Sequence, residues 1–180
     1  MLIRPARAED SAECAAIYAP FVTGTAVSFE TEPPTAAQMA ERIASCLRTH
    51  PWLVAEDGDG FLGYAYATAH RRRPAYRWAA EVSVYVGPQA RRRGVGRALY
   101  GGLLADLSRC GYRLALAGVT LPNPASVALH EAMGFEPVGV YRGVGYKLGA
   151  WHDVGWWQRA LGSGAAGHPA PPVPYPEISG

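Results

Sequence analysis

A basic stretch beside two glycines is the part of this sequence whose residue types point most clearly to chemistry. Residues 91–97 read Arg-Arg-Arg-Gly-Val-Gly-Arg, and the apolar residues that follow recur at the spacing of one helix face. A loop that enters a helix turns backbone N–H groups toward one point, where the helix dipole adds partial positive charge. Glycine lets a ligand approach the backbone closely, and arginine adds bidentate donors. We therefore predict a phosphate or diphosphate site formed by Arg91, Arg92, Arg93, Gly94, Val95, Gly96 and Arg97.

Two common nucleotide-binding motifs do not fit this loop. Residues 94–99 lack the third glycine of the dinucleotide fingerprint, and no Gly-Lys-Ser/Thr follows as it would in a Walker loop. The alternative that stays open is a basic turn that only caps a helix.

A carboxylate stands on the strand expected just before the loop. Residues 81–86 alternate and are rich in β-branched and aromatic types, so Glu81, Ser83 and Tyr85 share one strand face. A carboxylate inside a covered sheet is costly unless it is paired or used. Glu81 is therefore a candidate general base, and the alternative is a structural salt bridge to a nearby arginine such as Arg77.

A second group of polar residues falls on the helix expected after residue 123. Asn123 is a good N-cap before Pro124, and Ser126 and His130 follow at spacings that place all three on one helix face. A lone helical histidine is more often a surface or structural residue than a catalytic one.

The 91–97 loop resembles the Arg/Gln-x-x-Gly-x-Gly/Ala acetyl-CoA loop of the GNAT acyltransferase superfamily. Further motifs resemble those of the phosphinothricin N-acetyltransferase group, and they lie at residues 29–32, 78–81, 121–123, 129–135 and 151–158. Together they extend over about residues 1 to 160. The resemblance implies a GNAT fold, acetyl-CoA as cosubstrate without a metal, and acetylation of the amino group of a small amino acid or analogue such as phosphinothricin or methionine sulfoximine. It also implies an association with herbicide resistance.

The resemblance assigns roles within the acetyl-transfer site. Glu81 corresponds to the proposed base, which would allow direct attack of the amine on the thioester. His130 stands where many GNAT enzymes have a tyrosine that protonates the leaving thiolate, so we expect it to support proton transfer or a water network linked to Glu81. The backbone of Val84, Tyr85 and Val86 is expected to pair with the pantetheine arm. Asn123 and Ser126 would contribute to cofactor binding, and the Asn123 amide N–H stays free for this when its oxygen caps the helix.

The resemblance also implies an acceptor pocket, formed by Phe29, Arg71, Arg73, Tyr76 and Tyr85. Guanidinium groups suit the carboxylate of an amino acid. The alternative for the arginines is a solvated run of charge. A lysine is common in the family where Arg71 stands here, so the preferred side-chain anion of the acceptor could differ.

Composition limits the remaining possibilities. The chain has 180 residues, enough for one domain with a core, and 49% of them are hydrophobic. Its apolar runs are too short to span a bilayer and its first residues lack a signal-peptide core, so we expect a cytoplasmic protein with no membrane partner. Three cysteines, Cys14, Cys46 and Cys110, are expected to be buried thiols, and the five histidines show no metal-ligand spacing.

The order of predicted elements defines the fold class. A β-meander with two N-terminal helices is followed by β-α-β-α-β-β, with the last strands at 135–141 and 154–161 and a glycine-rich loop between them. We expect an α/β (α+β in some schemes) fold with a mixed, mostly antiparallel sheet and helices on both faces. The acetyltransferase domain would comprise residues 1–161, and the Pro/Gly-rich residues 162–180 would form a disordered tail.

Rival functions remain at this stage. Within enzymes, the acceptor could be another small amine or a protein N-terminus. In another class, the chain could bind nucleic acid, because eight of its 17 Lys and Arg residues fall between Arg71 and Arg97 although the net charge is only +2. The interleaved aromatic residues of single-strand binders are missing there, so we expect no nucleic-acid partner. The resembled group implies a homodimer, for which residues 151–157 are a plausible apolar interface.

Overall fold

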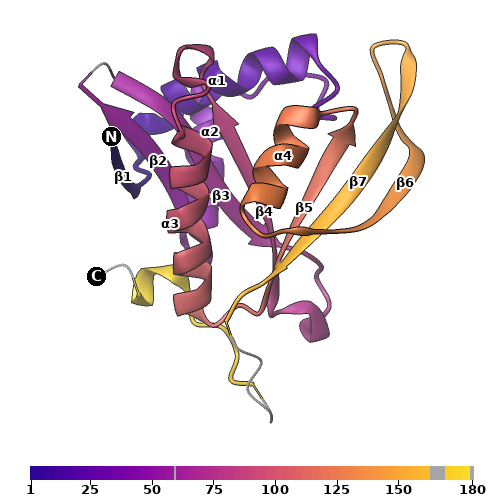
Figure 1. The fold of residues 1–180 in the computed structure, drawn as a ribbon. Helices are drawn as coiled ribbons and strands as arrows, with labels where there is room; N and C mark the ends of the chain where they lie inside the picture. Colours follow the sequence, from indigo (N-terminus) through magenta and orange to yellow (C-terminus); the bar gives the residue numbers. More distant parts are fainter. Residues whose placement is uncertain (59, 163–168, 179–180) are drawn as a thin grey trace.

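The fold is a single seven-stranded sheet with helices packed on both of its faces. The computed structural model describes residues 1–58, 60–162 and 169–178. The strands lie in the order β1-β2-β3-β4-β5-β7-β6, and only the β4–β5 pair is parallel. The elements, shown in Figure 1, are β1 (Leu2–Pro5), α1 (Ser11–Gly24), α2 (Ala36–Leu47), β2 (Trp52–Asp57), β3 (Gly60–Ala69), β4 (Ala79–Val86), α3 (Val95–Cys110), β5 (Leu114–Leu121), α4 (Pro124–Ala132), β6 (Glu136–Lys147) and β7 (Ala150–Ala160).

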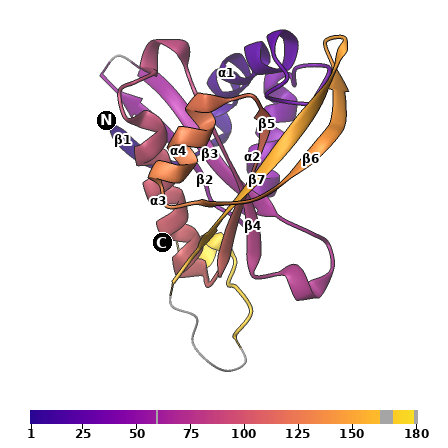
Figure 2. The same ribbon diagram turned by 45° about the vertical axis from the view of Figure 1, so that its right-hand side comes forward.

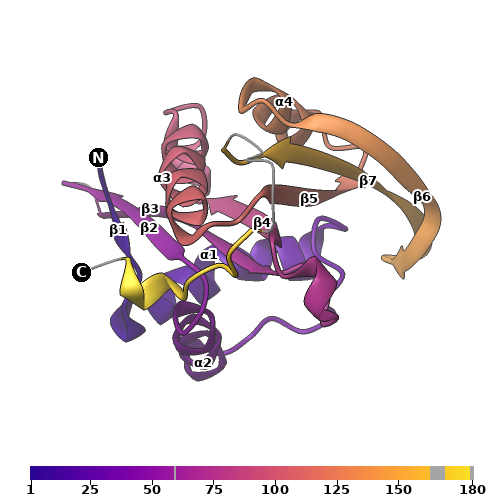
Figure 3. The same ribbon diagram turned by 90° about the horizontal axis from the view of Figure 1, so that it is seen from below.

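The helices divide between the two faces of the sheet, with α1 and α2 on one side and α3 and α4 on the other (Figure 3). The larger apolar cluster includes Leu99, Leu103 and Leu107 of α3, which are fully buried against β2 to β5. The smaller cluster joins α1 and α2 to the aromatic side chains of β2 and β3. This architecture confirms the predicted fold class.

The C-terminal hairpin is longer than the sequence indicates. Residues 142–153 were expected to form a glycine-rich loop, but β6 continues to Lys147 and β7 begins at Ala150. The turn between them consists of Leu148 and Gly149, both with positive φ (52° and 78°), as tight hairpins require. Glycine is depleted in strands, yet cross-strand pairing with β7 overrides that preference here. The hairpin forms one end of the sheet (Figure 2).

Two further segments differ from what local sequence favours. Pro20 lies inside the first helix, yet α1 continues through it to Gly24. The tail was expected to be disordered, and residues 163–168 and 179–180 lie outside the described residues. Residues 169–178, however, pack on the domain, and Tyr175 is only 4% exposed. Apolar anchors offset the low hydrophobicity of this stretch, and its prolines reduce the conformational entropy lost on ordering.

The feature that positions the functional site is the separation of β4 from β5. Their parallel pairing covers only the three pairs that end at Glu81 and Leu116. Beyond this point β4 continues to pair with β3, and β5 continues to pair with β7. The inner edges of the two strands therefore diverge in the middle of the sheet.

Candidate active site

A cleft lies where β4 and β5 diverge. Its volume is about 60 Å³. Its walls come from β4, the C-terminal half of β5, α3, the start of α4 and the connection between α1 and α2. They are formed by Val27, Val82, Ser83, Val84, Tyr85, Tyr100, Gly118, Val119, Thr120, Asn123, Ser126 and His130. The cleft brings together five predicted site residues, namely Val84, Tyr85, Asn123, Ser126 and His130. An extended ligand with amide groups suits such an opening, because it can pair with a free strand edge.

The predicted phosphate loop lies at the rim of this cleft. A short 3-10 turn at Pro88–Ala90 follows β4, and α3 begins at Val95 after Gly94, which has a φ of 78°. A Cβ added to Gly96 would lie 3.2 Å from Leu129 Cδ2 and 3.7 Å from Val86 Cγ2. The absence of a side chain at Gly96 thus lets the N-terminus of α3 approach the end of β4 and α4. The N-terminal amides of this 16-residue helix add partial positive charge beside the end of β4.

The arginines of the loop do not all have the same environment. Arg91, Arg92 and Arg97 are exposed, and Arg92 adopts a φ of 62°, a conformation that L-residues rarely take. Arg93 forms an ion pair with Asp57 at the end of β2, with Nη2 2.8 Å from Oδ2. Arg93 therefore ties the loop to the β2 end of the sheet, whereas the other three are free to meet an anion.

Glu81 lies at the last parallel pair before the strands diverge. Its Oε1 is 2.8 Å from Nδ1 of His70, and its side chain is 36% exposed. It faces the α1 and α2 side of the sheet together with Ser83 and Tyr85, as the alternation predicts. The predicted alternative partner, Arg77, instead donates to the Pro74 carbonyl. The base candidate is thus accessible and oriented by a histidine.

His70 was missed by the sequence analysis. It follows β3 directly, and the antiparallel register places Ala69 opposite Ala80, so His70 comes close to Glu81 from the neighbouring strand. Its ring also packs edge-on against Tyr76 and Trp156, with centroid distances of 5.7 and 6.1 Å. The contact between His70 and Glu81 depends on the exact register of β3 with β4, which the sequence does not give.

His130 is a buried residue on α4 with partners at both ring nitrogens. Its Nδ1 is 2.7 Å from the Ser126 carbonyl, and its Nε2 is 2.9 Å from the Tyr100 hydroxyl. A carbonyl can only accept, so Nδ1 carries the proton and Nε2 accepts from Tyr100. Burial lowers the pKa of His130, although the Ser126 carbonyl raises it in part. His130 is therefore neutral and held in one tautomer.

The two predicted catalytic residues lie on opposite faces of the sheet. His130 packs with Tyr100 and Phe135 on the α3 side, whereas Glu81 faces α1 and α2. The cleft between β4 and β5 connects the two faces, because both Ser83 and His130 line it. Tyr100, which the sequence analysis did not identify, is a further hydroxyl in this cleft.

Asn123 caps α4 as predicted. Its side-chain oxygen accepts from the Ser126 amide at 3.2 Å, which leaves the side-chain NH₂ group available toward the cleft.

The predicted acceptor residues lie in three separate places. Arg71, Arg73 and Tyr76 line one cavity of about 480 Å³, together with Arg72 and Arg77. Phe29 lies elsewhere, with its ring against Gly145 of β6 and 6.3 Å from the ring of His152. Tyr85 is packed among other aromatic residues, among them Tyr18, Phe21 and Tyr64.

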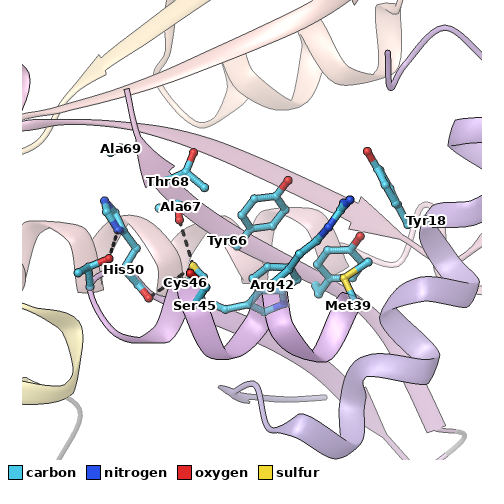
Figure 4. A pocket seen from close by; sticks show the side chains of 13 residues that line it. Tyr18, Met39, Arg42, Ser45, Cys46, His50, Tyr66, Ala67, Thr68 and Ala69 are labelled. Atoms are coloured by element: carbon cyan, nitrogen blue, oxygen red, sulfur yellow. Dashed lines mark hydrogen bonds between the residues drawn. The ribbon is translucent and has the colours of Figure 1, made fainter. Parts of the chain in front are cut away.

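A third cavity, of about 460 Å³, lies between α2 and β3 (Figure 4). Tyr18, Arg42 and Tyr66 line it, and their polar ends point the same way in the figure. Arg42 forms a bidentate ion pair with Glu30, at 2.8 and 2.9 Å, and lowers the pKa of that carboxyl. Thr68, also in the lining, is the cross-strand partner of Glu81. The sequence analysis did not predict this cavity, because only tertiary packing brings α2 over the sheet.

Two searches of the described part of the chain gave negative results. Among residues 1–58, 60–162 and 169–178, no group of His, Cys, Asp and Glu side chains could hold a metal ion. In the same residues, no helix has the length and apolar character needed to cross a membrane.

Comparison with known proteins agrees with this geometry. The phosphinothricin N-acetyltransferase of Streptomyces viridochromogenes is 40% identical over 171 residues, which cover 95% of this chain and 93% of the relative. An L-methionine sulfoximine/L-methionine sulfone acetyltransferase of Salmonella typhimurium is 35% identical, with 89% of this chain and 96% of the relative covered.

Solved structures show the same fold. The crystal structure of a GNAT superfamily phosphinothricin acetyltransferase from Sinorhizobium meliloti, in complex with acetyl-CoA, matches with a TM-score of 0.89 and 38% identity, over 94% of this chain and 92% of the other. A family model described as the acetyltransferase (GNAT) domain matches residues 3–156. The chain therefore belongs to the GNAT acetyltransferase family and is an acetyl-CoA-dependent N-acetyltransferase.

Proposed function

We propose that the acceptor is the amino group of a small amino acid or amino-acid analogue of the phosphinothricin or methionine sulfoximine type. The observation that carries this proposal is the arrangement around Glu81. The carboxylate is bonded to His70, whose ring packs on Tyr76, and Tyr76 lines a cavity with Arg71 and Arg73. Guanidinium groups suit the carboxylate of an amino acid. The candidate base, Glu81, is connected to this cavity through His70 and Tyr76.

The proposed cofactor position follows the elements around the cleft. The diphosphate of acetyl-CoA would meet the N-terminal amides of α3 and the exposed Arg91, Arg92 and Arg97. The pantetheine arm would run along the free edge of β4 at residues 84–86, and the Asn123 amide would donate to it. This places the thioester where β4 leaves β5, which is the position of Glu81.

In the proposed reaction Glu81 accepts a proton from the ammonium group, directly or through water. The free amine then attacks the thioester carbonyl carbon. The nitrogen of the tetrahedral intermediate gives up a second proton as the C–S bond breaks, and water carries this proton to the leaving thiolate on the side of the cleft where Tyr100 and His130 share a hydrogen bond. His130 then acts as a positioning residue for the Tyr100 hydroxyl, because its own N–H is committed to the Ser126 carbonyl.

The fold argues against nucleic-acid binding, the alternative function based on the arginines between Arg71 and Arg97. The arginines 71–77 precede β4 and the arginines 91–97 follow it, and β4 is eight residues long. Such a strand separates its two ends by more than about 20 Å. The basic residues thus form two clusters rather than one continuous surface.

We also propose a homodimer formed through the β6–β7 hairpin. Exposed apolar side chains gather on this hairpin, and they are Val138, Val140, Tyr141, Val144, Tyr146, Leu148 and Trp151. β6 is an edge strand, and edges of this kind pair readily with another chain. The predicted segment 151–157 contributes Trp151, whereas Trp157 is buried in the core.

One experiment tests the acceptor class. Release of free thiol from acetyl-CoA is measured against a panel that contains phosphinothricin, methionine sulfoximine, common amino acids, a polyamine and a peptide with a free N-terminus. We expect the highest kcat/KM for an amino-acid analogue with a second polar or anionic group. Preference for the peptide or the polyamine would contradict the proposal.

A further inference from the structure

The Pro-rich residues Pro169–Ile178, here the C-terminal segment, have a composition suited to docking. Five of these ten residues are prolines. Residues 169–174 lie outside any helix or strand, whereas Tyr175–Glu177 form a short 3-10 turn in which the Glu177 amide donates to the Pro174 carbonyl. Proline-rich chains are stiff and lose little entropy on docking, which is why aromatic-lined grooves bind them in other proteins.

The backbone of the segment takes part in four hydrogen bonds to the rest of the domain, one of them from the Arg109 side chain to the Ile178 carbonyl. Trp78 Nε1, at the start of β4, donates to the Ala170 carbonyl at 2.8 Å. The Val173 amide donates to the Cys110 carbonyl at the end of α3, also at 2.8 Å. The Tyr175 amide donates to the Thr49 carbonyl after α2, at 3.2 Å. An indole that donates to a carbonyl of a proline-rich chain is the contact by which aromatic grooves read such ligands.

Side chains fix the register of the segment. Tyr175 is 4% exposed, belongs to the main apolar cluster and hydrogen-bonds to Asp106. Gly111 has a φ of 92°, and a Cβ there would lie 3.7 Å from the Cα of Pro172. The segment is therefore seated in a groove with one deep anchor.

The same segment forms a wall of the arginine cavity. Pro171–Pro174 line it from one side, and Arg71–Arg73, Tyr76 and Arg77 line it from the other. Trp78, which holds the segment, is adjacent to Arg77, whose guanidinium carbon lies 5.4 Å from the centroid of the indole ring. The loop 71–77 thus lies between the segment and His70, the partner of Glu81.

We infer that the C-terminal segment is an intramolecular proline-rich ligand that positions the loop 71–77, and that Trp78 and Tyr175 are positioning residues for acceptor binding. The kinetic part of this inference rests on the proposed acceptor site, whereas the docking part does not. The segment lies beyond residues 3–156, which the acetyltransferase (GNAT) domain covers.

The test uses the full-length protein, three variants of it and two measurements, hydrogen exchange and steady-state kinetics. Val173→Pro removes the amide that donates to Cys110, and Val173→Ala keeps it. Trp78→Phe removes the indole N–H and keeps an aromatic ring. Hydrogen exchange reports docking at the Tyr175 amide, and it reports loop order at the Tyr76 amide, which bonds to the Arg73 carbonyl at 3.0 Å. We expect protection of both amides to fall about tenfold in Val173→Pro and Trp78→Phe, the effect of losing one hydrogen bond, and to stay unchanged in Val173→Ala.

Steady-state kinetics completes the test. We expect the acceptor KM to rise about threefold to tenfold in Val173→Pro and Trp78→Phe. The kcat and the KM for acetyl-CoA should stay as in the unsubstituted protein. Loss of Tyr175 protection without any change at Tyr76 or in the acceptor KM would overturn the positioning role. A Tyr175 amide that exchanges freely in the unsubstituted protein would overturn the docking itself. Failure to acetylate any amino acid would refute the proposed acceptor and leave the exchange result to decide the docking.

Discussion

Glu81 is the residue on which the proposed proton transfer depends. We expect Glu81→Gln to lower kcat/KM by about 100-fold or more, because general-base catalysis contributes factors of this size. The amide keeps the shape of the side chain and its contact with His70 but cannot accept the proton. Measurements of kcat/KM for the two proteins at several pH values provide the test.

Glu41→Gln is a matched control, because Glu41 is exposed on α2. Unchanged rates in Glu81→Gln would remove the base assignment.

Two buried histidines predict how stability depends on pH. Burial lowers the pKa of both His50 and His130. Between that lowered pKa and the ordinary value near 6.5, the unfolded chain binds protons that the folded chain does not. The free energy of unfolding therefore rises with pH through this window, and stability is lost as the pH falls below about 6.5.

Urea unfolding at several pH values measures this dependence. In His130→Gln the slope of the unfolding free energy against pH should decrease by up to about 1.4 kcal/mol per pH unit. The slope is the relevant quantity, since the loss of the Tyr100 bond lowers stability at every pH. An unaltered slope would mean that His130 titrates alike in both states.

At the scale of the element, α3 offers two glycines with opposite expectations. Gly94 begins the helix with a φ of 78°, and Gly101 lies within the helix. Neither position has an atom within 4 Å of an added Cβ. An added methyl group therefore meets no neighbour at either position, and only the backbone conformation distinguishes Gly94 from Gly101.

We expect Gly94→Ala to cost about 1–2 kcal/mol, because L-residues are strained at positive φ. Gly101→Ala should stabilise the protein by about 0.5–1 kcal/mol through the higher helix propensity of alanine. Chemical denaturation measures both changes. Equal effects of the two substitutions would contradict this explanation of the loop.

Element boundaries show what sequence alone can and cannot predict here. A capping residue was sufficient for α4, which begins after the predicted Asn123 cap. The extended β6–β7 hairpin was missed, because its glycines favour a loop locally. The pairing with β7 is interrupted between Tyr141 and Gly145, where Gly143 has a φ of 54°, and it resumes at Gly145. The divergence of β4 from β5 could not be predicted from the sequence either, because it depends on which strand edges pair.

Within the site, the motifs predicted residues better than they predicted partners. Glu81 and His130 were identified, but their partners His70 and Tyr100 are set by cross-strand register and by the packing of α3 on α4. Arg93 was expected at the diphosphate, yet it pairs with Asp57, a residue 36 positions earlier. Long-range pairs of this kind leave no periodic signal in a single sequence.

At the scale of the whole molecule, the exposed hairpin predicts an assembly. Trp151 is 69% exposed and Tyr146 62%, and the two rings lie 5.3 Å apart on neighbouring strands. Removing such a pair from water is favourable, so we expect a homodimer that Trp151→Glu shifts to monomer. Light scattering coupled to size exclusion measures the mass. Trp151→Phe, which keeps the apolar ring, should stay dimeric, and a monomeric unsubstituted protein would refute the interface.

Only three residue pairs join β4 to β5, so few backbone hydrogen bonds connect the two halves of the sheet. A cofactor arm lying in that gap would supply main-chain partners that no strand provides, so it would complete the sheet as well as deliver an acetyl group. Saturating coenzyme should then raise the melting temperature and slow exchange at amides on the inner edges of both halves together. Without acetyl-CoA, we expect unfolding to begin with the separation of β4 from β5.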